Sequence, residues 1–245
     1  MKEKIDISNL PRHIAVIMDG NGRWAQNKGA ARIFGHQSAI KAVREVTEGC
    51  AELGIEYLTL YAFSTENWSR PKLEIDGLMR LLVSSLRKEL STLNKNDVKL
   101  RTIGGIENLP KKCQIELTEA IENTKNNKGL QLILALNYSG RWELLNAVKQ
   151  MATAVKEGSL KIDEIDEKLF SQFLETAEIP DPELLIRTSG ELRVSNFLLW
   201  QIAYTELYMT SILWPDFRKE DLLQAIQAYQ SRERRFGRIS EQVNS

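Results

Sequence analysis

The segment VIMDGNGRWA, residues 16–25, joins a short apolar run to an acid, an arginine and a tryptophan across two glycines. The run that it ends, residues 13–18, has the length and composition of a buried strand, and the glycines predict a tight turn after it. A turn requires the glycines but not a carboxylate, a guanidinium and an indole. The polar residues after this strand are therefore candidates for a functional site.

The composition of the 245-residue chain is that of one large α/β domain, with 42% hydrophobic and 27% charged residues. We expect the domain to span 1–245, with residues 1–12 as an extension and 237–245 as a tail. The 33 basic residues equal the 33 acidic ones, and this balance argues against a nucleic-acid partner. The only cysteines, Cys50 and Cys113, are far apart and predict reduced structural thiols. No apolar run is long enough for a signal peptide or a membrane span, so we expect a cytoplasmic protein.

Short apolar runs alternate with helical patterns along the chain. The expected strands are residues 13–18, 57–63, 98–103, 130–136, 184–187 and 207–211. The expected helices are residues 36–53, 74–93, 111–125, 141–156, 163–174 and 219–236. This β-α-β order predicts a mainly parallel six-stranded sheet with helices on both sides.

Polar clusters lie at several strand ends, where open parallel sheets bind ligands. They follow the first, second and fifth strands, in residues 19–24, 64–70 and 187–196, and Glu206 precedes the sixth. The arginines near these ends are Arg23, Arg32, Arg70, Arg187 and Arg193. Arginine binds phosphate in a bidentate manner, and Mg²⁺ is held by one or two carboxylates, such as Asp19 and Glu206, plus substrate phosphates. The residues at these strand ends therefore predict a site for multiply charged phosphates. We expect His36 to open a helix beside this site, where the helix N-terminus favours a phosphate.

Other phosphate and metal motifs fit less well. GNGRWA matches the dinucleotide pattern G-x-G-x-x-A, but the second strand ends in Phe63-Ser64 instead of an acid, and Trp24 would crowd a pyrophosphate. The segment 29–35 lacks the Lys-Ser/Thr of a P-loop, and Trp24 stands where an EF-hand loop needs glycine. A phosphotransferase with Asp19 as nucleophile lacks the usual second Asp, because Asn21 occupies that position.

Motifs distributed over residues 13–238 resemble the cis-prenyltransferase family, most closely its bacterial undecaprenyl diphosphate synthases. They are HIAVIMDGNGRWA (13–25), FGH (34–36), YAFSTENWSRP (61–71), NYSGRW (137–142), IRTSGELRVSNFLLWQIAYTELY (186–208) and WPDF (214–217). No DDxxD motif, the Mg²⁺ site of the all-helical trans-prenyltransferases, occurs in the chain. Ser139 and Ser189 depart from the family pattern, in which glycine is commoner, and Ser189 adjoins the diphosphate loop.

The resemblance implies that isopentenyl diphosphate is added repeatedly, with cis double bonds, to farnesyl diphosphate in an Mg²⁺-dependent homodimer. It assigns Asp19 to Mg²⁺ and catalysis, Asn67 to proton removal, and Glu206 to the metal site of the partner subunit. The substrate-binding residues that it implies are Gly20, Asn21, Gly22, Arg23, Trp24, Arg32, His36, Ser64, Thr65, Glu66, Trp68, Arg70, Arg187, Arg193, Val194 and Ser195. It also implies that the element 235–237 reaches the partner's active site.

The wide apolar stripe of the expected helix 74–93 predicts one wall of an apolar product tunnel, although Leu82 or Leu86 also fits an ordinary core. Burial of a growing chain contributes about 0.8 kcal/mol per CH₂, which favours its entry. A lipid product also implies transient contact with a membrane surface. The alternative is a non-catalytic accessory subunit, but relatives of that kind lose catalytic-loop residues that are present here: Asp19, Asn67, Arg193 and Ser195.

Overall fold

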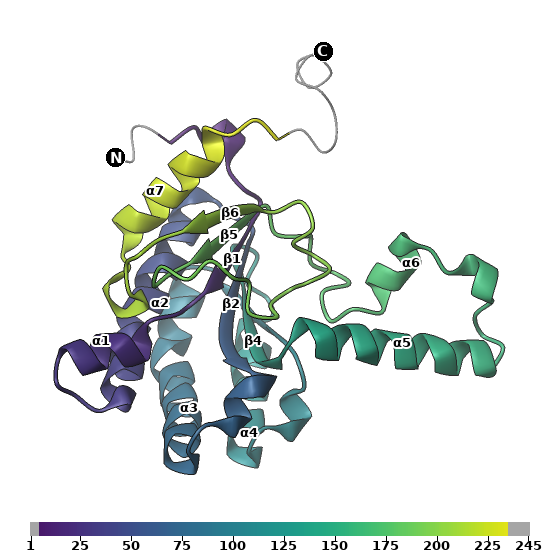
Figure 1. Ribbon diagram of the computed structural model, residues 1–245, viewed down its shortest axis with the longest axis horizontal. Helices are drawn as coiled ribbons and strands as arrows, with labels where there is room; N and C mark the ends of the chain where they lie inside the picture. Colours follow the sequence, from purple (N-terminus) through teal and green to yellow (C-terminus); the bar gives the residue numbers. More distant parts are fainter. Residues whose placement is uncertain (1–4, 235–245) are drawn as a thin grey trace.

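The computed structural model describes residues 5–234 and contains a six-stranded sheet whose strands are all parallel (Figure 1). The strands are β1 (His13–Ile17), β2 (Tyr57–Ser64), β3 (Lys99–Ile103), β4 (Gln131–Tyr138), β5 (Leu184–Arg187) and β6 (Glu206–Met209). Their spatial order is β3-β4-β2-β1-β5-β6. The expected α/β fold is confirmed. Part of the expected extension, the tail and the 235–237 element lie outside the described residues.

Seven α-helices connect or follow these strands in the described part of the chain. They are α1 (Asn21–Asn27), α2 (Arg32–Leu53), α3 (Lys72–Lys95), α4 (Lys111–Thr124), α5 (Gly140–Lys156), α6 (Glu167–Gln172) and α7 (Lys219–Gln230). The sequence pattern missed α1, where a turn was expected. The prediction of a helix over 163–174 was too long, because Asp166 caps α6 by accepting the Leu169 N–H at 2.7 Å.

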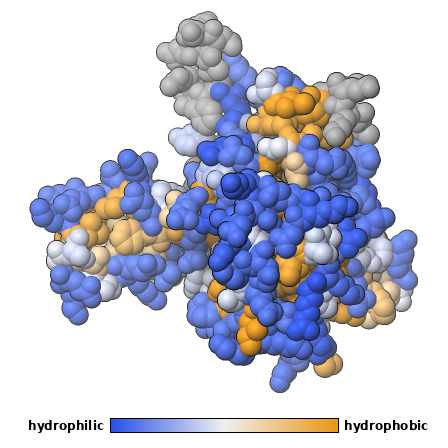
Figure 2. All heavy atoms as spheres, turned by 180° about the vertical axis from the view of Figure 1, so that it is seen from behind, coloured by the Kyte–Doolittle hydropathy of each residue, from blue (hydrophilic) through white to orange (hydrophobic). Residues whose placement is uncertain are grey.

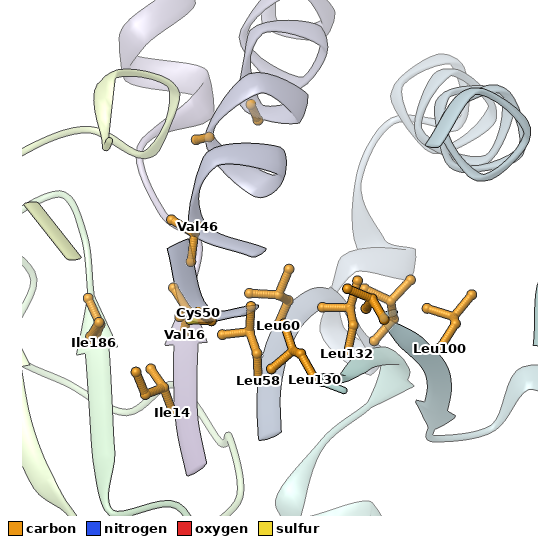
Figure 3. Packing of buried hydrophobic residues seen from close by; sticks show 14 of the residues in the cluster. Ile14, Val16, Val46, Cys50, Leu58, Leu60, Leu100, Leu130, Leu132 and Ile186 are labelled. Carbon is orange, nitrogen blue, oxygen red and sulfur yellow. The ribbon is translucent and has the colours of Figure 1, made fainter. Parts of the chain in front are cut away.

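Helices lie on both faces of the sheet, as expected from the sequence, but most of them lie on one face. Helices α2, α3, α4 and α7 bury their apolar residues in one cluster with alternate strand residues. Figure 3 shows part of this layer, in which Val46 and Cys50 of α2 lie above Val16 and Leu58. The other face is covered by the start of α5 and by the β5–β6 connection, through residues such as Phe197. Because β1, β4 and β5 are covered on both sides, their sequences lack polar alternation.

Helices α5 and α6 form an arm that projects from the sheet (Figure 1). Several apolar side chains of this arm are exposed, among them Leu145, Val148 and Ile162. Figure 2 shows apolar surface along the projecting arm. The arm therefore offers an apolar surface outside the compact body of the chain. Within residues 5–234, none of the helices has the length and apolar character needed to cross a bilayer.

The sheet changes winding direction at β1, which lies between β2 and β5. The chain proceeds from β1 to β2 on one side, and later reaches β5 on the other. Such a switch point opens a crevice at the carboxyl ends of the strands. In this chain the crevice is bordered by Asp19 after β1, Ser64 at the end of β2 and Arg187 at the end of β5.

Candidate active site

The turn after β1 depends on Gly20. Its φ of +106° is accessible mainly to glycine, and an added Cβ would come within 2.9 Å of the Leu213 side chain. The turn leads directly into α1, because the Trp24 N–H donates to the Gly20 carbonyl at 2.8 Å. A side chain at Gly22 would in turn meet the Arg32 guanidinium at 3.1 Å. Because Gly20 and Gly22 lack side chains, Leu213 and the Arg32 guanidinium can lie close to the turn beside Asp19.

Asp19 lies at the carboxyl end of β1 with its side chain about one-third exposed. One carboxylate oxygen accepts the Gly20 N–H at 2.7 Å, and the other accepts Nη2 of Arg187 at 2.8 Å. Burial acts to raise the pKa of Asp19, but the hydrogen bonds from Arg187, Ser189 and Gly20 outweigh it and lower the pKa. Asp19 is therefore ionised at neutral pH and still reaches solvent.

Arg187 links β1 to the loop that follows β5. Its side chain is only 3% exposed. Besides the bond to Asp19, Nη1 donates to Ser195 Oγ at 2.6 Å and to the carbonyl of Arg193. The buried Nε has no hydrogen-bond partner. A buried guanidinium with one unused donor suits an additional anionic ligand.

A second group of charges surrounds Arg23 on α1. Arg23 donates to Ser189 Oγ at 2.5 Å and lies 3.2 Å from Glu191, which also pairs with Arg193 at 2.5 Å. Ser189 has a φ of +80°, a conformation that favours glycine. The backbone thus favours glycine at this position, while the serine here supplies a partner for Arg23.

The loop after β2 forms a short 3₁₀ helix, η3 (Thr65–Ser69). Asn67 turns back to accept the Ser64 N–H at 3.2 Å, and Ser64 accepts the N–H of Asn67 in a capping box. Thr65 donates to Ser139 Oγ at 2.8 Å, so η3 is tied to the start of α5. This turn therefore fixes the side chain of Asn67 beside the end of β2.

Three basic side chains converge on Glu74 in the first turn of α3. Glu74 lies 3.2 Å from Arg70 and 3.7 Å from both Arg32 and His36. Burial, together with the positive charges of Arg70 and Arg32, lowers the pKa of His36 to about 4. The expectation that His36 opens a helix was wrong, because α2 begins four residues earlier at Arg32. His36 instead presents a neutral imidazole from the helix side.

A cavity of about 680 Å³ extends from these polar groups into the apolar layer between the sheet and helices α2 and α3. At its polar end, the cavity mouth, it is lined by Asp19, Asn67, Arg187 and Ser195. Its interior is lined mainly by leucines: Leu60, Leu78, Leu81, Leu82, Leu86, Leu93, Leu100, Leu132, Leu134 and Leu136. The cavity therefore combines an ionic end with a long apolar interior.

Unused hydrogen-bonding atoms gather at the cavity mouth. Buried atoms without a partner include Asn21 Oδ1, His36 Nε2 and Arg187 Nε, and all three residues line the cavity. Leaving a buried polar atom unpaired costs about 1–3 kcal/mol. Their shared location indicates that the mouth is built for a polar ligand.

The structure brings together many, but not all, of the residues predicted for the site. Those that line the cavity are Asp19, Asn21, His36, Ser64, Glu66, Asn67, Arg70, Arg187 and Ser195. Gly20, Gly22, Arg23, Arg32 and Arg193 lie immediately around them. Thr65, Trp68 and Val194 support neighbouring loops without lining the cavity; Trp68 donates to Asn137 Oδ1 at 2.7 Å.

Trp24 and Glu206 lie away from the cavity mouth. The Trp24 indole donates to Asp216 at 2.8 Å, and Trp24 is not among the residues that line the cavity. Glu206 begins β6 and thus lies at the opposite edge of the sheet from Asp19, where it pairs with Arg232 at 2.7 Å. A parallel strand places its first and last residues at opposite edges, so the two carboxylates of one chain cannot share a metal ion.

Sequence reasoning missed Glu74, and it gave no individual role to Glu191 and Asn196 within the polar cluster 187–196. Glu74 follows Arg70 at the (i, i+4) spacing of a helical ion pair, which is a usable signal. Glu191 lies between Arg187 and Arg193 in the sequence, but acidic residues in a basic loop are often only solvated. Asn196 is revealed only by contacts with distant segments.

Comparison with known proteins places this site in a family. The sequence matches the family described as "Putative undecaprenyl diphosphate synthase" over residues 17–237. It is 52% identical over 236 residues to an isoprenyl transferase of Chlorobaculum tepidum, covering 96% of this chain and 89% of that protein. A Pasteurella multocida protein named ditrans,polycis-undecaprenyl-diphosphate synthase ((2E,6E)-farnesyl-diphosphate specific) is 50% identical over 238 residues, covering 97% of this chain and 99% of the relative.

A solved structure shares the fold. Lavandulyl diphosphate synthase from Lavandula x intermedia, crystallised with dimethylallyl diphosphate, matches with a TM-score of 0.91 and 39% identity, covering 93% of this chain and 98% of that one. The fold and the comparisons define the class as prenyltransferases with an α/β sheet. Within this class, the chain belongs to the undecaprenyl diphosphate synthase family. The resemblance inferred from the sequence is confirmed.

Proposed function

We propose that this chain condenses isopentenyl diphosphate with farnesyl diphosphate and extends it to an undecaprenyl-type product with new cis double bonds. The observation that carries the proposal is the single cavity that joins the Asp19–Arg187 cluster to a leucine-lined interior. A diphosphate requires a charged cluster of this kind, and a prenyl chain requires an apolar interior. The names of the relatives support the same activity.

The arginines act on the charge that develops during the reaction. Breaking the allylic C1–O bond leaves a carbocation and places negative charge on the departing diphosphate. Arg23 and Arg70 stand near the cavity mouth, and we assign this diphosphate to them together with His36. Fixed cations aimed at developing charge lower the barrier without reorganising during the step.

The diphosphate of isopentenyl diphosphate is assigned to Arg187, Arg193 and Ser195. Arg187 is already oriented by Asp19 and Ser195, so only its unused Nε–H needs a new acceptor. The C4 double bond then attacks C1 of the allylic chain, and a proton leaves C2. Asn67 lies at the cavity mouth, where its amide can orient the group that accepts this proton.

Mg²⁺ is proposed as the metal, with Asp19 as its protein ligand. Among the described residues, no group of three or more His, Cys, Asp or Glu side chains could hold a metal ion. A lone, partly exposed carboxylate beside arginines nevertheless suits Mg²⁺, which often binds one carboxylate plus substrate phosphates. When bound, the ion would stabilise negative charge on the leaving diphosphate. Glu206 would contribute only from a partner subunit.

A homodimer is proposed on two features of the surface. Strand β6 is an edge of the sheet, with Leu207 and nearby Tyr204 exposed, and the α5–α6 arm is apolar at Leu145 and Val148. Exposed apolar surface of this kind often marks an interface. Light scattering during gel filtration tests the dimer, and a monomer at micromolar concentration would contradict it.

The leucine-lined interior is proposed as the product tunnel, and release of so apolar a product implies transient contact with a membrane surface. Each CH₂ buried contributes about 0.8 kcal/mol, which draws the growing chain inward. Sedimentation of the protein with lipid vesicles, before and after turnover, tests the contact. No added binding by the product-loaded protein would count against it.

The activity is tested by incubating the purified protein with Mg²⁺, farnesyl diphosphate and labelled isopentenyl diphosphate. We expect an extractable long-chain polyprenyl diphosphate, whose length mass spectrometry determines. Absence of product under varied detergent conditions would refute the proposal. Product formed only after addition of a second protein would instead favour an accessory subunit.

A further inference from the structure

Asn196, the residue after Ser195, joins the loop after β5 to two other segments. Its carbonyl accepts the Gly140 N–H at 2.7 Å, and its Oδ1 accepts the Arg141 N–H at 3.0 Å. These amides belong to the first turn of α5, where backbone donors lack partners within the helix. Ser139, at the N-cap position, makes no side-chain capping bond. Asn196 therefore caps α5 from a distant part of the chain.

The side-chain nitrogen of Asn196 makes the third connection. Nδ2 donates to Glu66 Oε1 at 2.7 Å. Glu66 belongs to η3 and directly precedes Asn67, and all of Glu66, Asn67, Ser195 and Asn196 line the cavity. The bond therefore spans the cavity mouth, from the loop with the Arg187–Ser195 pair to the turn with Asn67.

The backbone around Asn196 adopts a conformation that needs such support. The φ angles of Ser195, Asn196 and Leu198 are +48°, +60° and +47°. Left-handed conformations of non-glycine residues cost about 1–3 kcal/mol each and persist only where surrounding contacts fix them. Here this conformation directs Ser195 Oγ to Arg187 at 2.6 Å while Asn196 faces Glu66.

We propose that Asn196 is a positioning residue that fixes Asn67 relative to Ser195 and thereby aligns the two substrates. The inference rests on the function proposed above. Each half of the mouth retains its own ligands for a diphosphate without Asn196, so binding of either substrate depends little on it. Misplacing reacting groups by about 1 Å costs on the order of 100-fold in rate. Asn196 therefore acts on kcat more than on KM.

The test is Asn196→Asp, which keeps an oxygen to accept the Arg141 N–H but sets a second carboxylate against Glu66. We expect kcat to fall about 10- to 100-fold, with both KM values within about threefold. The control is Asn108→Asp, because Asn108 Nδ2 also donates to a glutamate, Glu107, at 2.7 Å on the exposed surface. Its kcat should stay within about twofold of the wild type.

Reversing the polarity of the pair separates positioning from loss of folding. In Asn196→Asp/Glu66→Gln, the new amide donates to the new carboxylate, so kcat should rise about tenfold above that of Asn196→Asp. Glu66→Gln alone completes a double-mutant cycle, which measures the coupling between the two residues. Two results with an active wild type would refute this inference and leave the proposed function standing. They are an unchanged kcat in Asn196→Asp, and a double variant that is no faster than Asn196→Asp. An inactive wild type would refute the proposed function, and this inference with it.

Discussion

The two faces of the sheet bury strand residues in opposite ways. On one face, Leu60 and Leu134 line a cavity beneath α2 and α3. On the other, Ile133 packs with Tyr138 and Phe197, whose rings meet edge to face with centroids 6.1 Å apart. Residues 133 and 134 are neighbours on β4, so the alternation of strand side chains assigns one to each layer. Similar apolar sequence thus builds a solid core on one side and a hollow on the other.

A carboxylate accompanies each layer, and their environments differ in the same way. Asp19 at the cavity mouth pairs with Arg187, and its pKa is lowered. Glu143, in the compact layer, accepts only neutral donors: the Tyr138 O–H at 2.6 Å, Gln201 at 3.0 Å and the Glu175 N–H at 3.0 Å. Burial raises the pKa of Glu143. Asp19 is thus an ionised group placed to act on ligands, whereas Glu143 holds neighbouring segments together through its hydrogen bonds.

The largest expected effect comes from exchanging each carboxylate for its amide. Asp19→Asn should lower kcat by at least about 10²–10³, the range lost when one electrostatic group of an active site is removed. Glu143→Gln should keep kcat within about threefold, because Glu143 does not line the cavity. Steady-state assays with labelled isopentenyl diphosphate compare the two. Equal losses of activity would break the distinction between the layers.

The matched stability measurement has a defined sign. Because the folded-state pKa of Glu143 is raised, the folded chain holds a proton that the unfolded chain releases near pH 4.5. The contribution of Glu143 to the free energy of unfolding should therefore fall as the pH rises above that value. Glu143→Gln should lack this contribution, at the cost of an unsatisfied donor worth about 1–3 kcal/mol. Urea denaturation at several pH values measures both.

The next largest effect concerns stability at adjacent positions of β4. Ile133→Ala should lower the free energy of unfolding by about 2–5 kcal/mol, because it opens a void in a filled layer. Leu134→Ala removes the same number of carbons but enlarges a cavity that already exists. It should therefore lower the free energy of unfolding by about 2 kcal/mol or less. Urea denaturation of both variants is the measurement. A larger loss for Leu134→Ala would show that the cavity face is packed as tightly as the other.

Filling the cavity should change the product instead of the fold. In Leu134→Phe the added ring enters open space, so stability should change by less than about 1.5 kcal/mol, while the product becomes shorter by one or more C5 additions. Ala135→Leu, on the compact face, should instead lose about 1–3 kcal/mol by overpacking and keep its product length. Mass spectrometry of the products and urea denaturation distinguish them. Unchanged product length in Leu134→Phe would argue that the chain grows elsewhere.

The sequence was sufficient for the parts of the fold that depend on local pattern. Buried parallel strands are short apolar runs, and five-residue β1 was located to within one residue. The helix α1 was missed because GNGRWA contains turn residues, and only the contact of Gly20 with Leu213 shows why the chain turns there. The strand-end clusters around Asp19 and Arg187 were predictable from parallel topology alone.

The rest of the site depends on contacts between distant segments. Trp24 was placed among the substrate-binding residues by the motif that contains it, but its partner Asp216 is 192 residues away. Glu206 was grouped with Asp19 because both flank strands, although they flank opposite ends. Whether buried leucines fill a layer or surround a hollow depends on the separation of the helices above them. No periodicity in one chain records that distance.

The smallest expected effect uses the only two histidines of the chain, one on each face. Burial lowers the pKa of both to about 4, but His36 also lies near the charges of Arg70 and Arg32, whereas His13 bonds Thr59 at 2.8 Å within the compact layer. Below pH 6.5 the unfolded chain takes up protons that the folded chain does not, so stability should fall as the pH drops from about 6.5 toward 4. Each histidine contributes to this acid lability.

A diphosphate should distinguish the two imidazoles. Its negative charge offsets that of Arg70 and Arg32, so bound inorganic pyrophosphate should raise the pKa of His36 by about 1–3. His13 has no access to the ligand, and its pKa should not move. NMR titration of the two imidazole signals in tag-free protein measures this, with His36→Gln to assign them. If both pKa values rise equally, the anion acts through the net charge of the protein; if neither rises, the cavity mouth does not bind a diphosphate beside His36.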